Sequence, residues 1–136
     1  MKKSEFHMRR SDNSLVHLAD ILKAIPNNNW VWAVQHFYGV GEAPGGLSMP
    51  EFEEICDSTP GGVRFSWDDI KNFASHINEV WDCFIVAVLN ESMLTTYVNH
   101  ENINDCIMFI EGIDSTIWNI ILGNEPILKT INFDNI

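Results

Sequence analysis

The 136-residue chain is poor in cysteine and has no long apolar run. Its 3 cysteines, Cys56, Cys83 and Cys106, are an odd number and show no C-x-x-C spacing. We interpret them as buried thiols in a reducing compartment, because an odd count argues against a closed disulfide framework. No apolar run approaches the ~20 residues of a membrane span. Residues 1–14 are not followed by the apolar stretch of a signal peptide. These absences predict a soluble, cytoplasmic protein.

Basic residues are also scarce. The chain has 8 Lys and Arg against 19 Asp and Glu, a net charge of −11. Because Lys2, Lys3, Arg9 and Arg10 are half of the basic residues, residues 11–136 carry 4 basic and 18 acidic residues, a net charge of −14. Nucleic acid and anionic membranes would repel this segment, whereas a basic protein would be attracted to it.

Motifs of catalysis and metal binding are missing as well. The chain has no G-x-S-x-G, H-x-x-x-H or H-E-x-x-H spacing, and its 5 histidines are scattered over separate predicted elements. Its cysteines lie in an acidic chain, whereas a nucleophilic thiol needs an electropositive setting. We therefore expect a non-enzymatic protein with no cofactor and no metal site.

Residues 66–89 are predicted to form a helix that continues directly into a strand. Ser66 is an N-cap residue, and apolar side chains recur with helical spacing through Ile77. After Glu79 the period becomes two, with apolar residues on both faces, which is typical of a covered central strand. In this pattern Trp81 belongs to the core.

The other elements follow from the same patterns. Helices are predicted over residues 15–25, 48–58 and 125–133, the last with a strand as the alternative, and strands over residues 30–38, 106–113 and 116–122. Residues 63–65 have the composition of a short edge strand, and residues 91–105 that of a loop with a single helical turn. His36, on an apolar strand face, is interpreted as a hydrogen-bonded core histidine.

This order of elements predicts a flexible basic N-terminus at residues 1–11 and one α+β domain over residues 12–136. The domain would contain a four-stranded, mostly antiparallel sheet, with the short edge strand as an addition, and about four helices packed on it.

Acidic side chains gather on the outer faces of two predicted helices and at the start of the next strand. If the two helices are neighbours, these side chains form one negative patch that suits the cationic groove of a basic enzyme, for example a nuclease. The candidate partner-binding residues are Glu53, Glu54, Asp57, Asp68, Asp69, Glu79 and Asp82. A solvated face that only keeps the protein soluble is the alternative.

Three segments resemble the immunity proteins of bacterial polymorphic toxin and contact-dependent growth inhibition systems. They read SWDDI-x-x-F, V-W-D-x-x-I and I-E-G-I-D-S-T-I-W-x-I, and lie in the second half of the chain. The resemblance implies a protein that binds and neutralises one cognate toxin domain, and it carries over no catalytic residue. We expect the chain itself to be a monomer or a weak dimer.

The glycine-rich loop at residues 39–46 supports a different interpretation. It lacks the G-K-[ST] end of a phosphate-binding loop, and its only charge is Glu42. A pocket beside this loop, with His36 at its mouth, would indicate a small cytoplasmic ligand-binding or enzymatic α+β domain.

Overall fold

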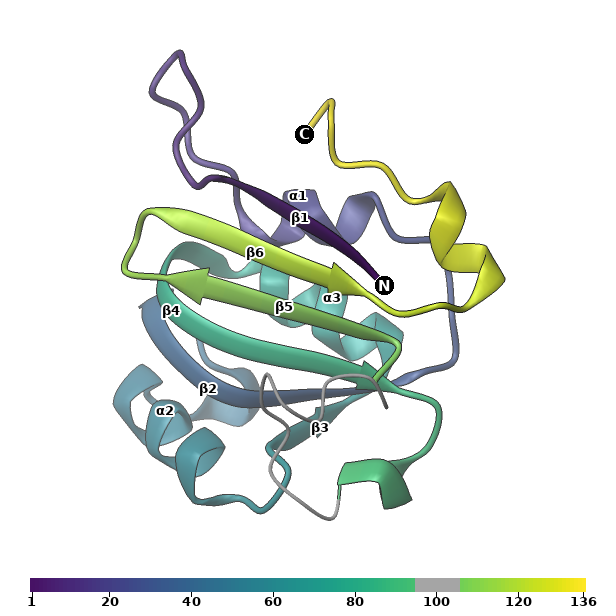
Figure 1. Cartoon of the computed structure of the whole chain (residues 1–136). Helices are drawn as coiled ribbons and strands as arrows, with labels where there is room; N and C mark the ends of the chain where they lie inside the picture. Colours follow the sequence, from purple (N-terminus) through teal and green to yellow (C-terminus); the bar gives the residue numbers. More distant parts are fainter. Residues whose placement is uncertain (95–105) are drawn as a thin grey trace.

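The computed structural model describes residues 1–94 and 106–136, and the strands of these segments form one six-stranded antiparallel sheet (Figure 1). The strands are β1 (Lys2–His7), β2 (Val31–Gly41), β3 (Val63–Phe65), β4 (Ile77–Val88), β5 (Met108–Ile113) and β6 (Ile117–Leu122). They lie in the order β1-β6-β5-β4-β2-β3, and every neighbouring pair is antiparallel. The described helices are α1 (Leu18–Lys23), α2 (Met49–Ser58) and α3 (Trp67–Ser75), with 3-10 turns η1 (Pro44–Gly46), η2 (Glu91–Leu94) and η4 (Pro126–Thr130).

The α+β class agrees with the prediction, but the predicted four-stranded sheet with about four helices is wrong. Within the described ranges the sheet has six strands and the chain has three α-helices. The helix expected over residues 125–133 is only the 3-10 turn η4. The short edge strand at residues 63–65 is present as β3, which pairs with residues 32–34 of β2. Much of the loop predicted at residues 91–105 lies outside the described residues.

Strand β1 comes from the segment that was expected to be a flexible N-terminus. It pairs with β6 along its whole length, from Lys2 opposite Leu122 to His7 opposite Ile117. Phe6 packs against Phe133, with ring centroids 6.1 Å apart. The strand forms by pairing with β6, which lies near the other end of the chain. No local sequence pattern predicts such a pairing. Its charged residues are typical of an outer strand, where they discourage pairing with a second sheet.

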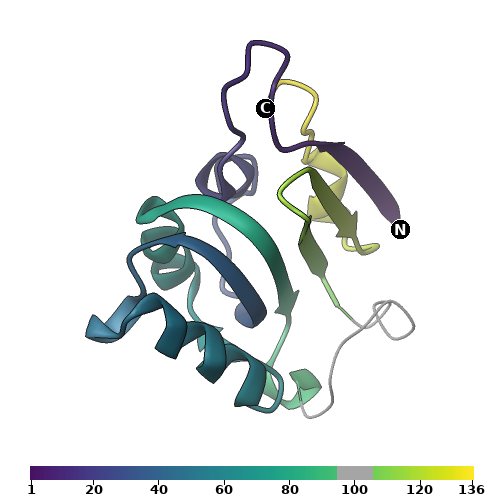
Figure 2. The ribbon, with the colours of Figure 1, turned by 90° about the vertical axis from the view of Figure 1, so that its left-hand side faces the viewer.

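Helices α1 and α3 lie on one side of the curved sheet, as Figure 2 shows, and enclose the main hydrophobic core. Buried side chains of this core include Trp32, Ile85, Ile110 and Trp118 from the sheet and Leu18, Ile21, Ile70 and Phe73 from the helices. A smaller cluster on the opposite face contains Phe84, Val86 and Phe109. No helix in the described ranges is long and apolar enough to cross a membrane.

The helix and strand predicted over residues 66–89 are confirmed at the centre of the fold. Ser66 Oγ accepts the backbone N–H of Asp69 at 3.1 Å and begins α3. The ring of Phe73 lies 5.3 Å from that of Phe37 and 5.2 Å from that of Phe52, measured between centroids. Strand β4 follows immediately and is paired on both edges, with β5 and with β2.

Two β-bulges change the direction of side chains that strict alternation would place in the core. In β2, Val34 and His36 lie opposite the consecutive residues Ile85 and Phe84, so Gln35 is an extra residue. His36 is therefore half-exposed, and its assignment as a core histidine is wrong. Beyond this bulge it is Phe37 that is buried, with 1% of its surface exposed.

The second bulge lies in β4. Tyr38 is paired with Asp82 and Gly39 with Val80, so Trp81 is the extra residue. The side chain of Trp81 is half-buried and lies against the exposed ring of Tyr38, which corrects its assignment to the core. The bulge thus moves a large aromatic side chain from the predicted interior to the surface.

We predict that truncating Phe73 destabilises the protein far more than truncating Trp81. Phe73→Ala removes a buried ring from the centre of an aromatic cluster and should lower the free energy of unfolding by about 3–5 kcal/mol. Trp81→Ala removes a half-exposed ring and should cost about 1–2 kcal/mol. Urea denaturation of the wild type and the two variants measures both values. An equal or larger cost for Trp81 would contradict the surface position given to this residue.

Candidate functional site

An aromatic pair, one ring exposed and one half-buried, lies on the paired strands β2 and β4. Tyr38 is 50% exposed, and its ring meets that of Trp81 edge to face, with centroids 4.6 Å apart. Val40, two residues further along β2, is 40% exposed. Tyr and Trp are the residues most enriched among the energetic centres of protein interfaces. Two exposed apolar side chains, Tyr38 and Val40, together with the half-buried ring of Trp81 therefore mark a candidate contact surface.

The same strand pairing places carboxylates beside the aromatic pair. Asp82 lies opposite Tyr38, and Glu79 lies opposite Val40. The backbone N–H of Asp114, in the turn between β5 and β6, donates to Asp82 Oδ1 at 3.0 Å. This hydrogen bond holds the turn against β4 and brings a third acidic residue to the site.

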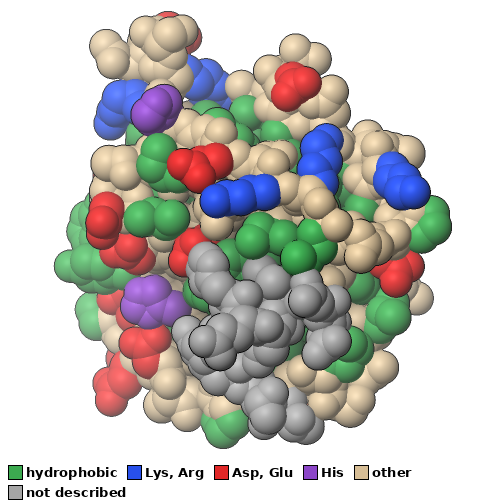
Figure 3. Space-filling view, viewed as in Figure 1, with side chains coloured by type: hydrophobic (Ala, Val, Ile, Leu, Met, Phe, Trp, Pro, Cys, Tyr) green, Lys and Arg blue, Asp and Glu red, His purple; other side chains and the backbone are tan. Residues whose placement is uncertain are grey.

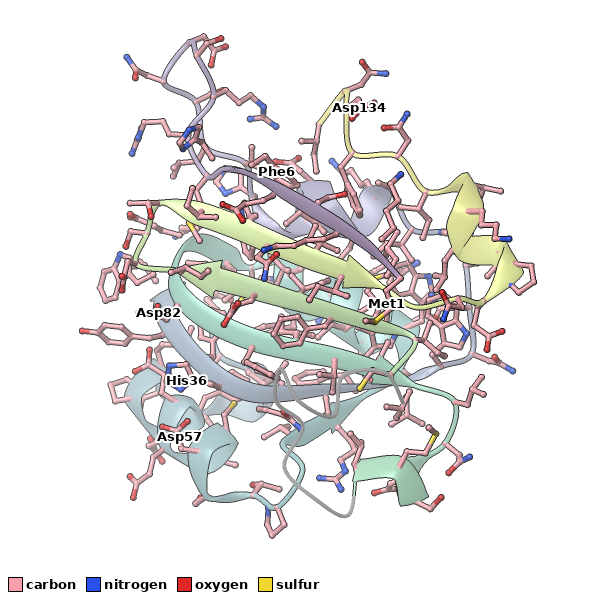
Figure 4. All side chains as sticks on the ribbon, in the orientation of Figure 1. Met1, Phe6, His36, Asp57, Asp82 and Asp134 are labelled. Atoms are coloured by element: carbon pink, nitrogen blue, oxygen red, sulfur yellow. The ribbon has the colours of Figure 1, made fainter. Side chains whose placement is uncertain are left out.

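Helix α2 contributes a fourth carboxylate. Asp57 Oδ1 lies 2.8 Å from Nδ1 of His36, which precedes Tyr38 by two residues on β2. Figure 4 shows Asp57, His36 and Asp82 along one edge of the molecule, and in Figure 3 acidic side chains flank hydrophobic ones at that edge. We call this surface the Tyr38 patch and define it as Tyr38, Val40, Trp81, Asp57, Glu79, Asp82 and Asp114.

Two predicted binding residues of α2 lie next to the patch, one of them in a structural role. Glu53 Oε2 accepts the backbone N–H of Gly39 at 3.1 Å. That N–H lies on the edge of β2 beyond residues 32–34, the only part of β2 that β3 pairs with. The carboxylate thereby satisfies a buried donor on an edge of β2 that β3 does not pair with. Glu54 is exposed.

Asp68 and Asp69 lie apart from the patch, at the start of α3. The ring of Trp67 lies 5.4 Å from that of Trp32, whereas Tyr38 is six residues further along β2, roughly 20 Å by the rise of a strand. Asp68 is paired with Lys71 at 3.6 Å, and its side chain is 92% exposed. The single negative patch expected across both helices is therefore not formed. The structure instead brings together Asp57, Glu79 and Asp82.

The aromatic members of the patch were missed by the sequence analysis. Tyr38 and Trp81 follow core patterns in β2 and β4, and only the bulge between the strands exposes them. The exposure of Asp114 could have been predicted from the sequence, since residues 113–116 have the pattern of a tight hairpin turn. Asp114 and Ser115 have φ values of 49° and 61°, as in a two-residue hairpin loop, so exposure of this carboxylate follows from the turn.

A separate cavity of about 430 Å³ lies between the loop after β2, strand β3 and helix α3. It is lined by residues 42–45 and 63–65 and by Asp69, Asn72, Phe73 and His76. The backbone N–H of Glu42 donates to the carbonyl oxygen of His76 at 3.0 Å and fixes the loop. Only glycine fits before it, because a Cβ at Gly41 would lie 2.4 Å from that oxygen. His76, and not His36, is the histidine of this cavity.

The cysteines that are buried near these sites are unsuited to nucleophilic chemistry. Burial raises the pKa of the Cys56 thiol to about 12, and the nearby carboxylates of Asp57 and Glu53 add to the shift. Burial also raises the pKa of the Cys83 thiol to about 12. Both thiols are protonated at neutral pH, and the thiolate is the nucleophile. Among the described residues, no three His, Cys, Asp or Glu side chains are arranged to hold a metal ion.

No protein-family model, curated protein or solved structure matches the chain. Its function is therefore inferred from the geometry and chemistry of its own surfaces.

We predict that Glu53 and Glu54, adjacent carboxylates on α2, contribute very differently to stability. Glu53→Ala leaves the N–H of Gly39 without its acceptor and should lower the free energy of unfolding by about 1–3 kcal/mol. Glu54→Ala, the matched control, changes an exposed side chain of the same helix and should shift stability by less than about 0.5 kcal/mol. Urea denaturation distinguishes the two. Equal effects would show that Glu53 does not hold the edge of β2.

Proposed function

We propose that this protein is a non-enzymatic immunity protein that binds and neutralises a basic toxin domain through the Tyr38 patch. The observation that carries the proposal is the contact between the exposed ring of Tyr38 and the half-buried ring of Trp81, with the four carboxylates of the patch around it. The excess of 19 acidic over 8 basic residues and the resemblance to immunity proteins support the same conclusion.

The two kinds of side chain have different tasks in such a complex. Tyr38 and Trp81 are amphipathic rings that lose little conformational entropy when covered, so they supply the apolar anchor of the interface. Arg and Lys of the partner can lie over these rings while pairing with the surrounding carboxylates. The carboxylates also attract a cationic surface before contact and can raise the association rate constant by orders of magnitude at low salt.

Neutralisation follows from what the patch would cover. A nuclease needs a cationic groove to hold the phosphates of its substrate. An acidic surface with an aromatic centre competes with the substrate for that groove. In the complex its aromatic side chains cover the groove. The inhibitor then needs no catalytic residue.

We predict that residues of the patch control binding to the toxin domain encoded beside the gene for this protein. Tyr38→Ala should accelerate dissociation by at least tenfold, because it removes a central anchor. Ile127→Ala is the matched control, since Ile127 is 47% exposed on η4, outside the patch, and it should leave the rate unchanged. Surface plasmon resonance measures the rates, and co-expression in a growth assay measures protection.

Two charge-reversed variants with equal net charge test which acidic residues contribute to electrostatic attraction of the toxin domain. Asp57→Lys with Glu79→Lys changes the patch, whereas Asp68→Lys with Asp134→Lys changes two exposed acids elsewhere. The first pair should slow association and flatten its salt dependence, and the second should have little effect. Equal effects of the two pairs would show that association depends on the overall charge of the protein and not on the carboxylates of the patch. A neighbouring gene that encodes no toxin, or a toxin domain that does not bind, would overturn the proposed function.

A further inference from the structure

We propose that the cavity beside α3 is a second binding site, which takes a small organic cation with a guanidinium or ammonium group on a short alkyl chain. This inference goes beyond the protein-binding role of the Tyr38 patch. None of the residues that define that patch lines the cavity.

The size of the cavity and its apolar walls favour an organic ligand. Its volume of about 430 Å³ falls within the range of small-molecule sites and far exceeds the space a bare metal ion needs. Phe65 and Phe73, with ring centroids 5.5 Å apart, contribute aromatic surface, and Val63 and Pro44 contribute aliphatic surface. An alkyl chain can be desolvated against these side chains.

The charges in the wall select a cation. Glu42 and Asp69 both line the cavity, from the loop after β2 and from the first turn of α3. Arg64 is the only basic side chain of the described lining other than His76. Its Nη1 donates to the carbonyl oxygen of Pro60 at 2.6 Å, and its Nε lies 3.2 Å from Glu91 Oε1. Because that guanidinium already pairs with Glu91, it does not offset the charges of Glu42 and Asp69, and the wall carries a net negative charge that disfavours an anion.

His76 and Asn72 add acceptors to the wall that can match N–H donors. His76 Nδ1 lies 2.8 Å from the carbonyl oxygen of Asn72, which can only accept, so the proton is on Nδ1. In the neutral ring the lone pair is then on Nε2. The side-chain amide of Asn72 adds a further oxygen. A guanidinium, which has five N–H donors in one plane, can use several such acceptors together.

Agmatine, an alkyl guanidinium with a second ammonium group, is the probe. Isothermal titration calorimetry should show saturable binding to the wild-type protein, and n-butylurea, a neutral planar analogue, should bind at least tenfold more weakly. Asp69→Asn and Glu42→Gln should each weaken agmatine binding by about tenfold, since each removes one charge-assisted hydrogen bond. Asp68→Asn, one residue away on the same turn and outside the cavity, is the matched control and should change affinity by less than about twofold.

Three results would overturn this proposal. Agmatine would fail to bind at ~10 mM, near the weak end of measurable affinity, or n-butylurea would bind equally well. Alternatively, Asp68→Asn would weaken binding as much as Asp69→Asn, which would mean that agmatine only responds to the overall negative charge. Two variants from different elements keep the test valid if one of them unfolds, and thermal unfolding checks both. Failure here leaves the proposed function intact, because binding of the toxin domain is measured on other residues.

Discussion

The pairing of β2 with β4 is the constraint on which both the core and the surface of this protein depend. Its regular part places Trp32, Val34 and Ile85 under the helices, and its bulges turn His36 and Trp81 outward. The extra residues Gln35 in β2 and Trp81 in β4 thus separate a continuous apolar interior from the aromatic pair at the surface. The surface that we assign to partner binding is a direct consequence of how these two strands align.

Local signals in the sequence were sufficient for much of the fold. The beginnings of α2 and α3 are examples. Ser48 forms a capping box with Glu51, and Ser66 caps α3, and such a cap depends only on residues three positions apart. The hairpin of β5 and β6 and the change of period at the start of β4 were readable for the same reason. Each of these features is decided within one or two turns of chain.

Features that depend on residues far apart in the sequence could not be predicted from local patterns. β1 was taken for a flexible segment because its six residues are mostly polar, and only β6 gives it a partner. Of the seven acidic residues singled out as a site, Asp68 and Asp69 proved to lie near Trp32, at the other end of β2 from the patch. Glu53 is a further example, since its structural role comes from accepting the backbone N–H of Gly39, a residue of another element. The set of side chains on this surface depends on strand register, which periodicity alone does not specify.

Hydroxyl-radical footprinting of the complex with the toxin domain tests the central claim most directly, because aromatic side chains that are exposed in the free protein are readily oxidised. The account predicts that oxidation of Tyr38 and Trp81 falls strongly on binding, while that of Ile127 and Leu89, which are also exposed in the free protein, is unchanged. Unchanged oxidation of Tyr38 and Trp81 in a saturated complex would contradict it and would place the interface on another face of the sheet.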